Sequence, residues 1–278
     1  DSLFYDVSAW TFPLAFNVNY SYTNGLNKAS ISRLIGDEVE SLEKPEGNVN
    51  SKSNYAYLFE PHEYYAQAAV YNIIKEGLRV KTATRKFSIE DKEYDYGTYL
   101  IPVQNQSMSS EGIYNKLIEV SQKYNIDFES QSTGITNGID LGSDYFIIVK
   151  EPKIGLIVGD GIRSYDAGEI WHLLDTRYDI PISKLDVDDL RSIDLDKYTH
   201  IILPDYNGGK LNSDQLSTYI NNGGNLIAYR NSVKWVSNNL SEIEFLSNDI
   251  KAKGISFSDR ENFYGAQQTG GAIFESNI

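Results

Sequence analysis

The sequence contains no cysteine, which excludes disulfide bonds, thiolate metal sites and a cysteine nucleophile. Histidine is also scarce, with three in 278 residues: His62, His172 and His200. None of them belongs to an H-x-x-E or H-E-x-x-H pair, so the chain carries no zinc-protease signature. We therefore predict no metal site and no cofactor in this chain.

Basic residues and long apolar runs are limited as well. Lys and Arg number 25 against 39 Asp and Glu, a formal net charge of −14, which argues against nucleic acid as a partner because phosphate affinity comes from cations. No apolar stretch approaches the roughly 20 residues that span a bilayer, so we predict no membrane span. The 41% hydrophobic and 13% aromatic content instead predict a packed core.

The most informative stretch covers residues 153–176. Residues 154–158 form an unbroken apolar run, typical of a strand covered on both faces. Gly159 and Gly161 then permit a sharp turn, and the helix that follows has one apolar stripe, made of Ala167, Ile170, Trp171 and Leu174. A strand, glycine turn and covering helix predict a doubly wound α/β domain, in which a ligand would bind at the carboxyl ends of the strands.

The same order of strands and helices recurs along the chain. Strands are predicted at residues 55–59, 78–83, 99–103, 146–149, 154–158, 180–185, 200–203 and 225–229, and helices at 61–76, 113–124, 164–176 and 213–221. Segment 94–103 matches segment 197–205 at an offset of about a hundred residues, which suggests two related units. The predicted divisions are an aromatic lead-in and polar insertion, two α/β units and a C-terminal extension: 1–54, 55–150, 151–240 and 241–278.

Other catalytic motifs fail on their spacing. The acidic run 186–196 has Arg191 where a calcium loop needs Gly and Lys197 where it needs Glu, so we interpret it as a surface loop. The glycine turn after residue 158 lacks a full phosphate-binding pattern, and a tight turn is the favoured interpretation. A nucleophile elbow would follow strand 225–229, where Ser232 lacks the flanking glycines. We therefore predict no catalytic residue.

One alternative is an independent small-ligand-binding or hydrolase module with a cleft at the carboxyl ends of the strands. Paired carboxylates there could do acid–base work if they converge. The candidate residues for this cleft are Asp160, Tyr165, Glu169, Asp205 and Tyr206.

Three segments together resemble a known family. FYDVSAWTFPLAF (4–16), AGEIWHLLDTRYDIPIS (167–183) and GGAIF (270–274) are similar to the region that follows the catalytic domain in bacterial zinc carboxypeptidases of the M14 family. The resemblance implies a flavodoxin-like, class I glutamine-amidotransferase-like doubly wound parallel sheet, and the internal match described above suggests two related units in tandem. It also implies that both ends are cut and that zinc belongs to a peptidase domain upstream of Asp1.

On this reading the chain is a non-catalytic accessory module of a secreted or periplasmic zinc metallocarboxypeptidase. Its expected partners are its own upstream peptidase domain, on which it packs, and a peptide substrate that it helps to hold. The contact candidates are Tyr5, Trp10 and Phe12; burial in the core of the module itself is the equal alternative for these aromatic residues.

Overall fold

The structure, a computed structural model, describes residues 46–243 without a break and, outside them, residues 13, 18–20, 25, 27, 32–33, 35–37, 41, 245, 253–260 and 263. Glu43–Glu244 forms one compact unit, and Asp1–Leu42 with Phe245–Ile278 forms the other. The candidate contacts Tyr5, Trp10 and Phe12 lie outside the described residues. Within the described part, no helix has the length and apolar character needed to cross a membrane.

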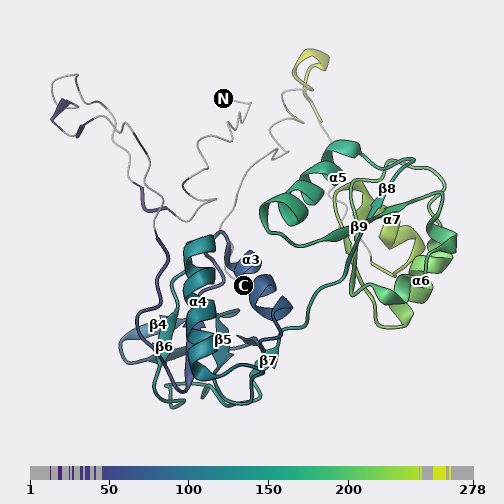
Figure 1. The fold of residues 1–278 in the computed structure, drawn as a ribbon. Coiled ribbons are helices and arrows are strands. Elements are labelled where there is room, and N and C mark those ends of the chain that lie inside the picture. The colour runs from purple at the N-terminus through teal and green to yellow at the C-terminus, as the bar shows by residue number, and fades with distance from the viewer. Residues whose placement is uncertain are drawn as a thin grey trace. The chain divides into compact units, whose positions relative to one another are not determined.

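Residues 46–150 build a region around an antiparallel sheet, hereafter the antiparallel region (Figure 1). Two helices and seven strands occur in it, two of the strands forming a separate hairpin (β3 with β4). In chain order these elements are β1 (Ala56–Phe59), α3 (Ala66–Lys75), β2 (Lys81–Ala83), β3 (Phe87–Ile89), β4 (Lys92–Tyr94), β5 (Tyr99–Pro102), α4 (Ser110–Tyr124), β6 (Glu129–Gln131) and β7 (Phe146–Ile148).

The five-stranded sheet has the order β6-β1-β5-β2-β7, and all neighbouring strands are antiparallel. Without the hairpin and β7, the elements follow the order β-α-β-β-α-β with β5 between β1 and β2, which is the split βαβ, ferredoxin-like topology. Helices α3 and α4 share one core with Tyr57, Phe59 and Ile101 on one face of the sheet. On the other face the hairpin contributes Phe87 and Tyr94 to a second core.

Residues 151–243 build a second region around a parallel sheet, hereafter the parallel region. Its strands have the order β9-β8-β10-β11, which is 2-1-3-4 in chain order, and every pair is parallel. The elements are β8 (Ile154–Val158), α5 (Ser164–Trp171), a π-helical turn (His172–Arg177), β9 (Ile182–Asp186), 3-10 turns at Leu190–Ser192 and Leu195–Lys197, β10 (His200–Leu203), α6 (Ser213–Asn221), β11 (Asn225–Ala228) and α7 (Asn231–Asn239). A further 3-10 turn, Phe257–Asp259, lies in the other compact unit.

Helices cover both faces of the parallel sheet. Helix α5 packs over Leu156 and Ile202 on one face, whereas α6 and α7 lie on the other face over Ile157 and Ile201 (Figure 1). The apolar stripe predicted on α5 is confirmed for Ala167, which is buried, and wrong for Trp171, whose side chain is 38% exposed and lies 5.4 Å from the Lys184 ammonium.

The expectation of two related parallel units in tandem is not shown by the structure. Segments 94–103 and 197–205, which look alike in sequence, contain β5 and β10, but β5 pairs antiparallel with both neighbours and β10 pairs parallel with both. The physical reason is visible in β1, the antiparallel neighbour of β5. This strand is buried on both faces, as a strand of a covered parallel sheet is, so the apolar pattern of the sequence does not distinguish antiparallel from parallel strands here. The structure therefore has a mixed α/β fold, in which one four-stranded parallel sheet occurs beside antiparallel sheets.

We predict that Leu117→Ala lowers the free energy of unfolding of the antiparallel region by about 2–5 kcal/mol. Leu117 is fully buried between α4 and the sheet, so truncation leaves a cavity. The matched variant Gln122→Ala changes an exposed residue of the same helix and should alter stability by less than about 0.5 kcal/mol. Urea unfolding followed by circular dichroism measures both, and equal effects would contradict the assignment of the core.

Candidate functional site

Three connections meet at the carboxyl edge of the parallel sheet. They are the β8 loop (residues 159–163), the β10 loop (residues 204–212) and the turn that joins β11 to α7 (residues 229–230). Because β8 lies between β9 and β10, the chain leaves β8 toward one side and returns to the other side of it through β10. This change of direction is the place where doubly wound sheets bind their ligands.

The β8 and β10 loops are hydrogen-bonded to each other across that position. The Arg163 N–H donates to the carbonyl oxygen of Asp205 at 2.9 Å, and the Asn207 N–H donates to that of Gly161 at 2.9 Å. Gly161 has φ +79°, and a Cβ there would collide with the carbonyl oxygen of Gly208. The glycine turn thus serves close contact between two backbones, and the two hydrogen bonds join the loops at the position where a doubly wound sheet has its ligand crevice.

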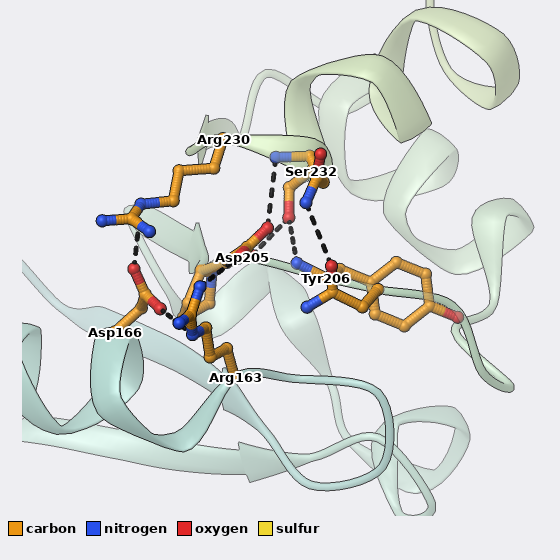
Figure 2. Close-up of polar contacts among 9 residues, drawn as sticks. Arg163, Asp166, Asp205, Tyr206, Arg230 and Ser232 are labelled. Carbon is orange, nitrogen blue, oxygen red and sulfur yellow. Dashed lines mark hydrogen bonds and ion pairs between the residues drawn. The ribbon is translucent and has the colours of Figure 1, made fainter. Parts of the chain in front are cut away.

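A chain of alternating charges links the three connections (Figure 2). Arg230 Nε lies 3.1 Å from Asp166 Oδ1, and Arg163 Nε lies 3.5 Å from Asp166 Oδ2. Arg163 Nη1 also lies 3.7 Å from Asp205 Oδ2. The carboxylate of Asp205 is 3% exposed, and its Oδ1 accepts the backbone N–H of Asn231 at 3.2 Å. A buried carboxylate is stable when it is paired and hydrogen-bonded, as here.

The turn between β11 and α7 has the backbone geometry of a nucleophile elbow. Arg230 adopts φ +52° and ψ −125°, a conformation that glycine favours and that costs other residues of the order of 1–3 kcal/mol. In a hydrolase elbow, a strained residue between strand and helix is the nucleophile, and the next N–H helps to bind the oxyanion. Here the strained residue is an arginine, and the next N–H, that of Asn231, is already bonded to Asp205.

Ser232 does not act as a substitute nucleophile in this geometry. It is fully buried, its hydroxyl donates to the carbonyl oxygen of Pro204, and it accepts the Tyr206 N–H at 2.9 Å (Figure 2). An activated serine needs an adjacent base and access for a substrate. Ser232 instead fastens the end of β10 to the first turn of α7.

The five candidate cleft residues take separate positions. Asp205 belongs to the charge chain, and Tyr206 is buried, with its hydroxyl accepting the Leu211 N–H at 3.2 Å and its ring 5.8 Å from that of Trp235. Asp160, Tyr165 and Glu169 are exposed, the first in the β8 loop and the other two on α5. Of the five candidates, the consecutive residues Asp205 and Tyr206 are therefore buried in the β10 loop, and the other three are at the surface.

The histidines are dispersed. His62 and His172 are exposed, and His200 Nδ1 lies 2.9 Å from the Thr199 hydroxyl. Across the residues that the structure describes, no group of three or more His, Asp or Glu side chains is arranged to hold a metal ion. The acidic run 186–196 forms the end of β9 and two 3-10 turns.

A depression of about 590 Å³ lies at the opposite, amino-terminal edge of the parallel sheet. His200, Tyr219 and Asn225 contribute to its wall, and the Tyr219 hydroxyl is committed to the backbone of Asn225. Topology places ligand chemistry of such sheets at the carboxyl edge instead. We therefore take the carboxyl edge as the candidate site.

Three residues of the site, Arg163, Asp166 and Arg230, are not among the candidate site residues predicted from the sequence. Arg163 and Asp166 stand three residues apart at a helix start, a spacing that favours an ion pair. Arg230 occupies the slot where a nucleophile elbow is expected from the strand order. These two signals could have identified the residues, but the pairing of Arg230 with Asp166 depends on the folded sheet.

We predict that Arg230→Gly is more stable than Arg230→Ala by about 1 kcal/mol. Both substitutions remove the ion pair with Asp166, but glycine also relieves the left-handed backbone conformation. Chemical unfolding of the two variants side by side measures the difference. Equal stabilities would mean that residue 230 is not held in this conformation.

We predict that Ser232→Ala costs about 1–3 kcal/mol of stability, because it leaves the buried N–H of Tyr206 without an acceptor. Ser237→Ala, on the same helix, removes a hydrogen bond that water can replace, and should cost less than about 0.5 kcal/mol. Thermal unfolding of both variants provides the test. A Ser232→Ala variant as stable as the Ser237→Ala variant would contradict the role given to this hydroxyl.

No protein-family model, no curated protein and no solved structure matches this chain. The similarity to the region that follows the catalytic domain of zinc carboxypeptidases therefore remains an expectation from the sequence.

Proposed function

We propose that the chain is a non-catalytic companion module of a secreted or periplasmic zinc metallocarboxypeptidase. In this proposal the parallel region is the flavodoxin-like, class I glutamine-amidotransferase-like part. Its 2-1-3-4 strand order corresponds to the first four strands of the flavodoxin-like order 2-1-3-4-5, and its helices cover both faces of the sheet. These features support the proposal for the fold of this region.

The observation that carries the non-catalytic role is the elbow at Arg230. An acyl-transfer site of this architecture needs a nucleophile at the elbow and a free N–H just after it. A guanidinium, always protonated, cannot be the nucleophile. The Asn231 N–H donates to the buried carboxylate of Asp205. The nucleophile position and the oxyanion donor of such a site are therefore both occupied by groups with structural contacts.

The alternative, an independent hydrolase or small-ligand module, finds less support. A hydrolase with paired carboxylates needs them to converge on one substrate atom. The carboxylates of Asp160 and Glu169 are exposed, whereas that of Asp205 is buried against Arg163 and Asn231. The β8 and β10 loops are also hydrogen-bonded to each other at the position where a ligand of a doubly wound sheet would bind.

The companion role is packing on the upstream peptidase domain or holding its peptide substrate, with zinc bound by that domain. This role predicts that the purified chain, supplied with Zn²⁺, retains less than stoichiometric zinc and hydrolyses none of a panel of peptides. A fluorophosphonate probe should label no serine, since Ser232 is buried. Metal analysis, peptide hydrolysis and mass spectrometry of the probe-treated chain provide the three readouts.

Stoichiometric zinc with turnover that is lost on His62→Ala, His172→Ala or His200→Ala would overturn the proposal. A second arm uses a peptidase that carries this module. Deletion of the module should lower the thermal stability of the peptidase or its kcat/KM, whereas an unchanged enzyme would contradict the companion role.

A further inference from the structure

The chain contains four Asn-Gly pairs, at residues 24–25, 137–138, 207–208 and 222–223. Such a pair can lose the side-chain amide of the asparagine without an enzyme. The backbone nitrogen of the glycine attacks Cγ of the asparagine, and no Cβ on the glycine obstructs the approach. Asn24 lies outside the described residues, and the structure allows the other three pairs to be compared.

Exposure does not distinguish these three pairs, because Asn137, Asn207 and Asn222 are all exposed. Hydrogen bonding does distinguish them. For the ring to close, the peptide group between asparagine and glycine must rotate until its nitrogen lies beside the asparagine side chain, and the side-chain nitrogen must be free to leave. Each hydrogen bond that holds one of these groups must open first, which slows the reaction.

The pair Asn222–Gly223 is held at both reacting nitrogens. The Gly223 N–H donates to the carbonyl oxygen of Ile220 at 2.9 Å. The side-chain nitrogen of Asn222 donates to the carboxylate of Asp196, 3.0 Å from Oδ2 and 3.3 Å from Oδ1. The attacking nitrogen and the departing nitrogen are therefore both engaged.

The pair Asn137–Gly138 is held in its backbone. The Asn137 N–H donates to the carbonyl oxygen of Ser88 at 2.8 Å, and the Ser88 N–H donates to that of Asn137 at 2.9 Å. This antiparallel bridge keeps Asn137 extended, and in extended backbone the next nitrogen does not lie beside the side chain of the same residue. Ring closure at Asn137 therefore requires the bridge to open.

The pair Asn207–Gly208, in the β10 loop, has neither kind of restraint. Within the described part of the chain, the carbonyl oxygen of Asn207 and the N–H of Gly208 make no hydrogen bond, so the peptide group between them can rotate. The Asn207 side chain has one contact, in which Oδ1 accepts the side-chain N–H of Asn231 at 3.0 Å. That donor lies at the oxygen on which negative charge develops during the attack, and it leaves Nδ2 free to depart.

We propose that Asn207–Gly208 is a deamidation site of the folded protein. The Gly208 nitrogen loses its proton to solvent base and bonds to Cγ of Asn207. The bond from Cγ to Nδ2 breaks, and the nitrogen takes up a proton and leaves as ammonia. Water then opens the resulting cyclic imide. Attack of water at Cγ gives aspartate, whereas attack at the backbone carbonyl carbon gives isoaspartate, in which the main chain runs through Cβ and Cγ.

The modification changes the junction between the β8 and β10 loops. Both products add a negative charge beside the Asn231 side chain, and isoaspartate also adds a carbon atom to the main chain between residues 207 and 208. The added atom lies between two groups that contact Gly161, namely the Asn207 N–H and the carbonyl of Gly208. Accumulation of isoaspartate therefore loosens the contact between the two loops as the protein ages.

Tryptic mapping of the aged protein tests the proposal, because the three pairs fall in separate peptides, 124–150, 198–210 and 211–230. The full chain is kept folded in mildly alkaline buffer, and a sample unfolded in guanidinium chloride gives the reference rates. In the folded chain we expect Asn207 to convert about tenfold faster than Asn137 or Asn222, whose hydrogen bonds must open first. In the unfolded chain the three rates should be similar.

The matched variant Asn207→Gln keeps a side-chain amide but can close only a larger, less favourable ring. It should abolish conversion in peptide 198–210, together with the acidic shift that the ageing wild-type chain shows in isoelectric focusing. Asn222→Gln should leave the rate at Asn207 unchanged. Circular dichroism of each sample before and after ageing shows that the chain stays folded.

Three results would overturn the proposal. They are a folded chain in which Asn207 converts no faster than Asn222, a folded chain in which Asn137 converts first, and an Asn207→Gln variant that acquires the acidic shift as fast as the wild-type chain. Aspartate and isoaspartate peptides have the same mass and separate by chromatography. A converted peptide 198–210 without isoaspartate would exclude the cyclic imide and would also overturn the proposal.

Discussion

The carboxylate of Asp205 sets the geometry of the whole carboxyl edge. Removing a carboxylate from water costs several kcal/mol unless a cation and hydrogen-bond donors compensate it. In this chain the compensation comes from Arg163 at the start of α5 and from the Asn231 N–H at the start of α7. The end of β10 is thereby tied to the helices that follow β8 and β11. The left-handed conformation of Arg230 is held between these ties.

Internal pairing occupies the groups that an elbow-type site of this architecture would use. Where an enzyme of this architecture would place a reactive side chain, a guanidinium pairs with Asp166. Where it would leave an N–H for a developing negative charge, a permanent negative charge of the protein is already bound. Both pairings are the observations on which the proposal of a non-catalytic role depends.

Much of the parallel region could be predicted from the sequence, and the pairing in the antiparallel region could not. The apolar runs 154–158 and 200–203 correctly predict strands covered on both faces. Run 55–59 has the same pattern because β1 is covered by helices on one side and the hairpin on the other, so its antiparallel pairing was hidden. The insertion of β5 between β1 and β2 depends on contacts distant in sequence, which no local pattern reports.

At the site, Asp205 was placed correctly at the end of a strand, but its role as an internal counter-ion required the folded position of Arg163. Helix α7 is absent from the predicted helices because its nine residues are mostly polar, although Trp235, Val236 and the following Leu240 pack on the core. The β3–β4 hairpin was missed because its strands have three residues each, too few for a period to be seen.

The hydrogen bonds between the β8 and β10 loops also limit which changes of sequence the parallel region can accept. In doubly wound proteins the loops at the carboxyl edge usually vary independently, and new specificity arises when one of them changes. Here the Arg163 and Asn207 amides join the two loops, and the close approach at Gly161 leaves no room for a side chain. An insertion in one loop therefore requires a compensating change in the other. Changes in the parallel region are therefore more easily accepted at its outer surfaces than at the carboxyl edge of the sheet.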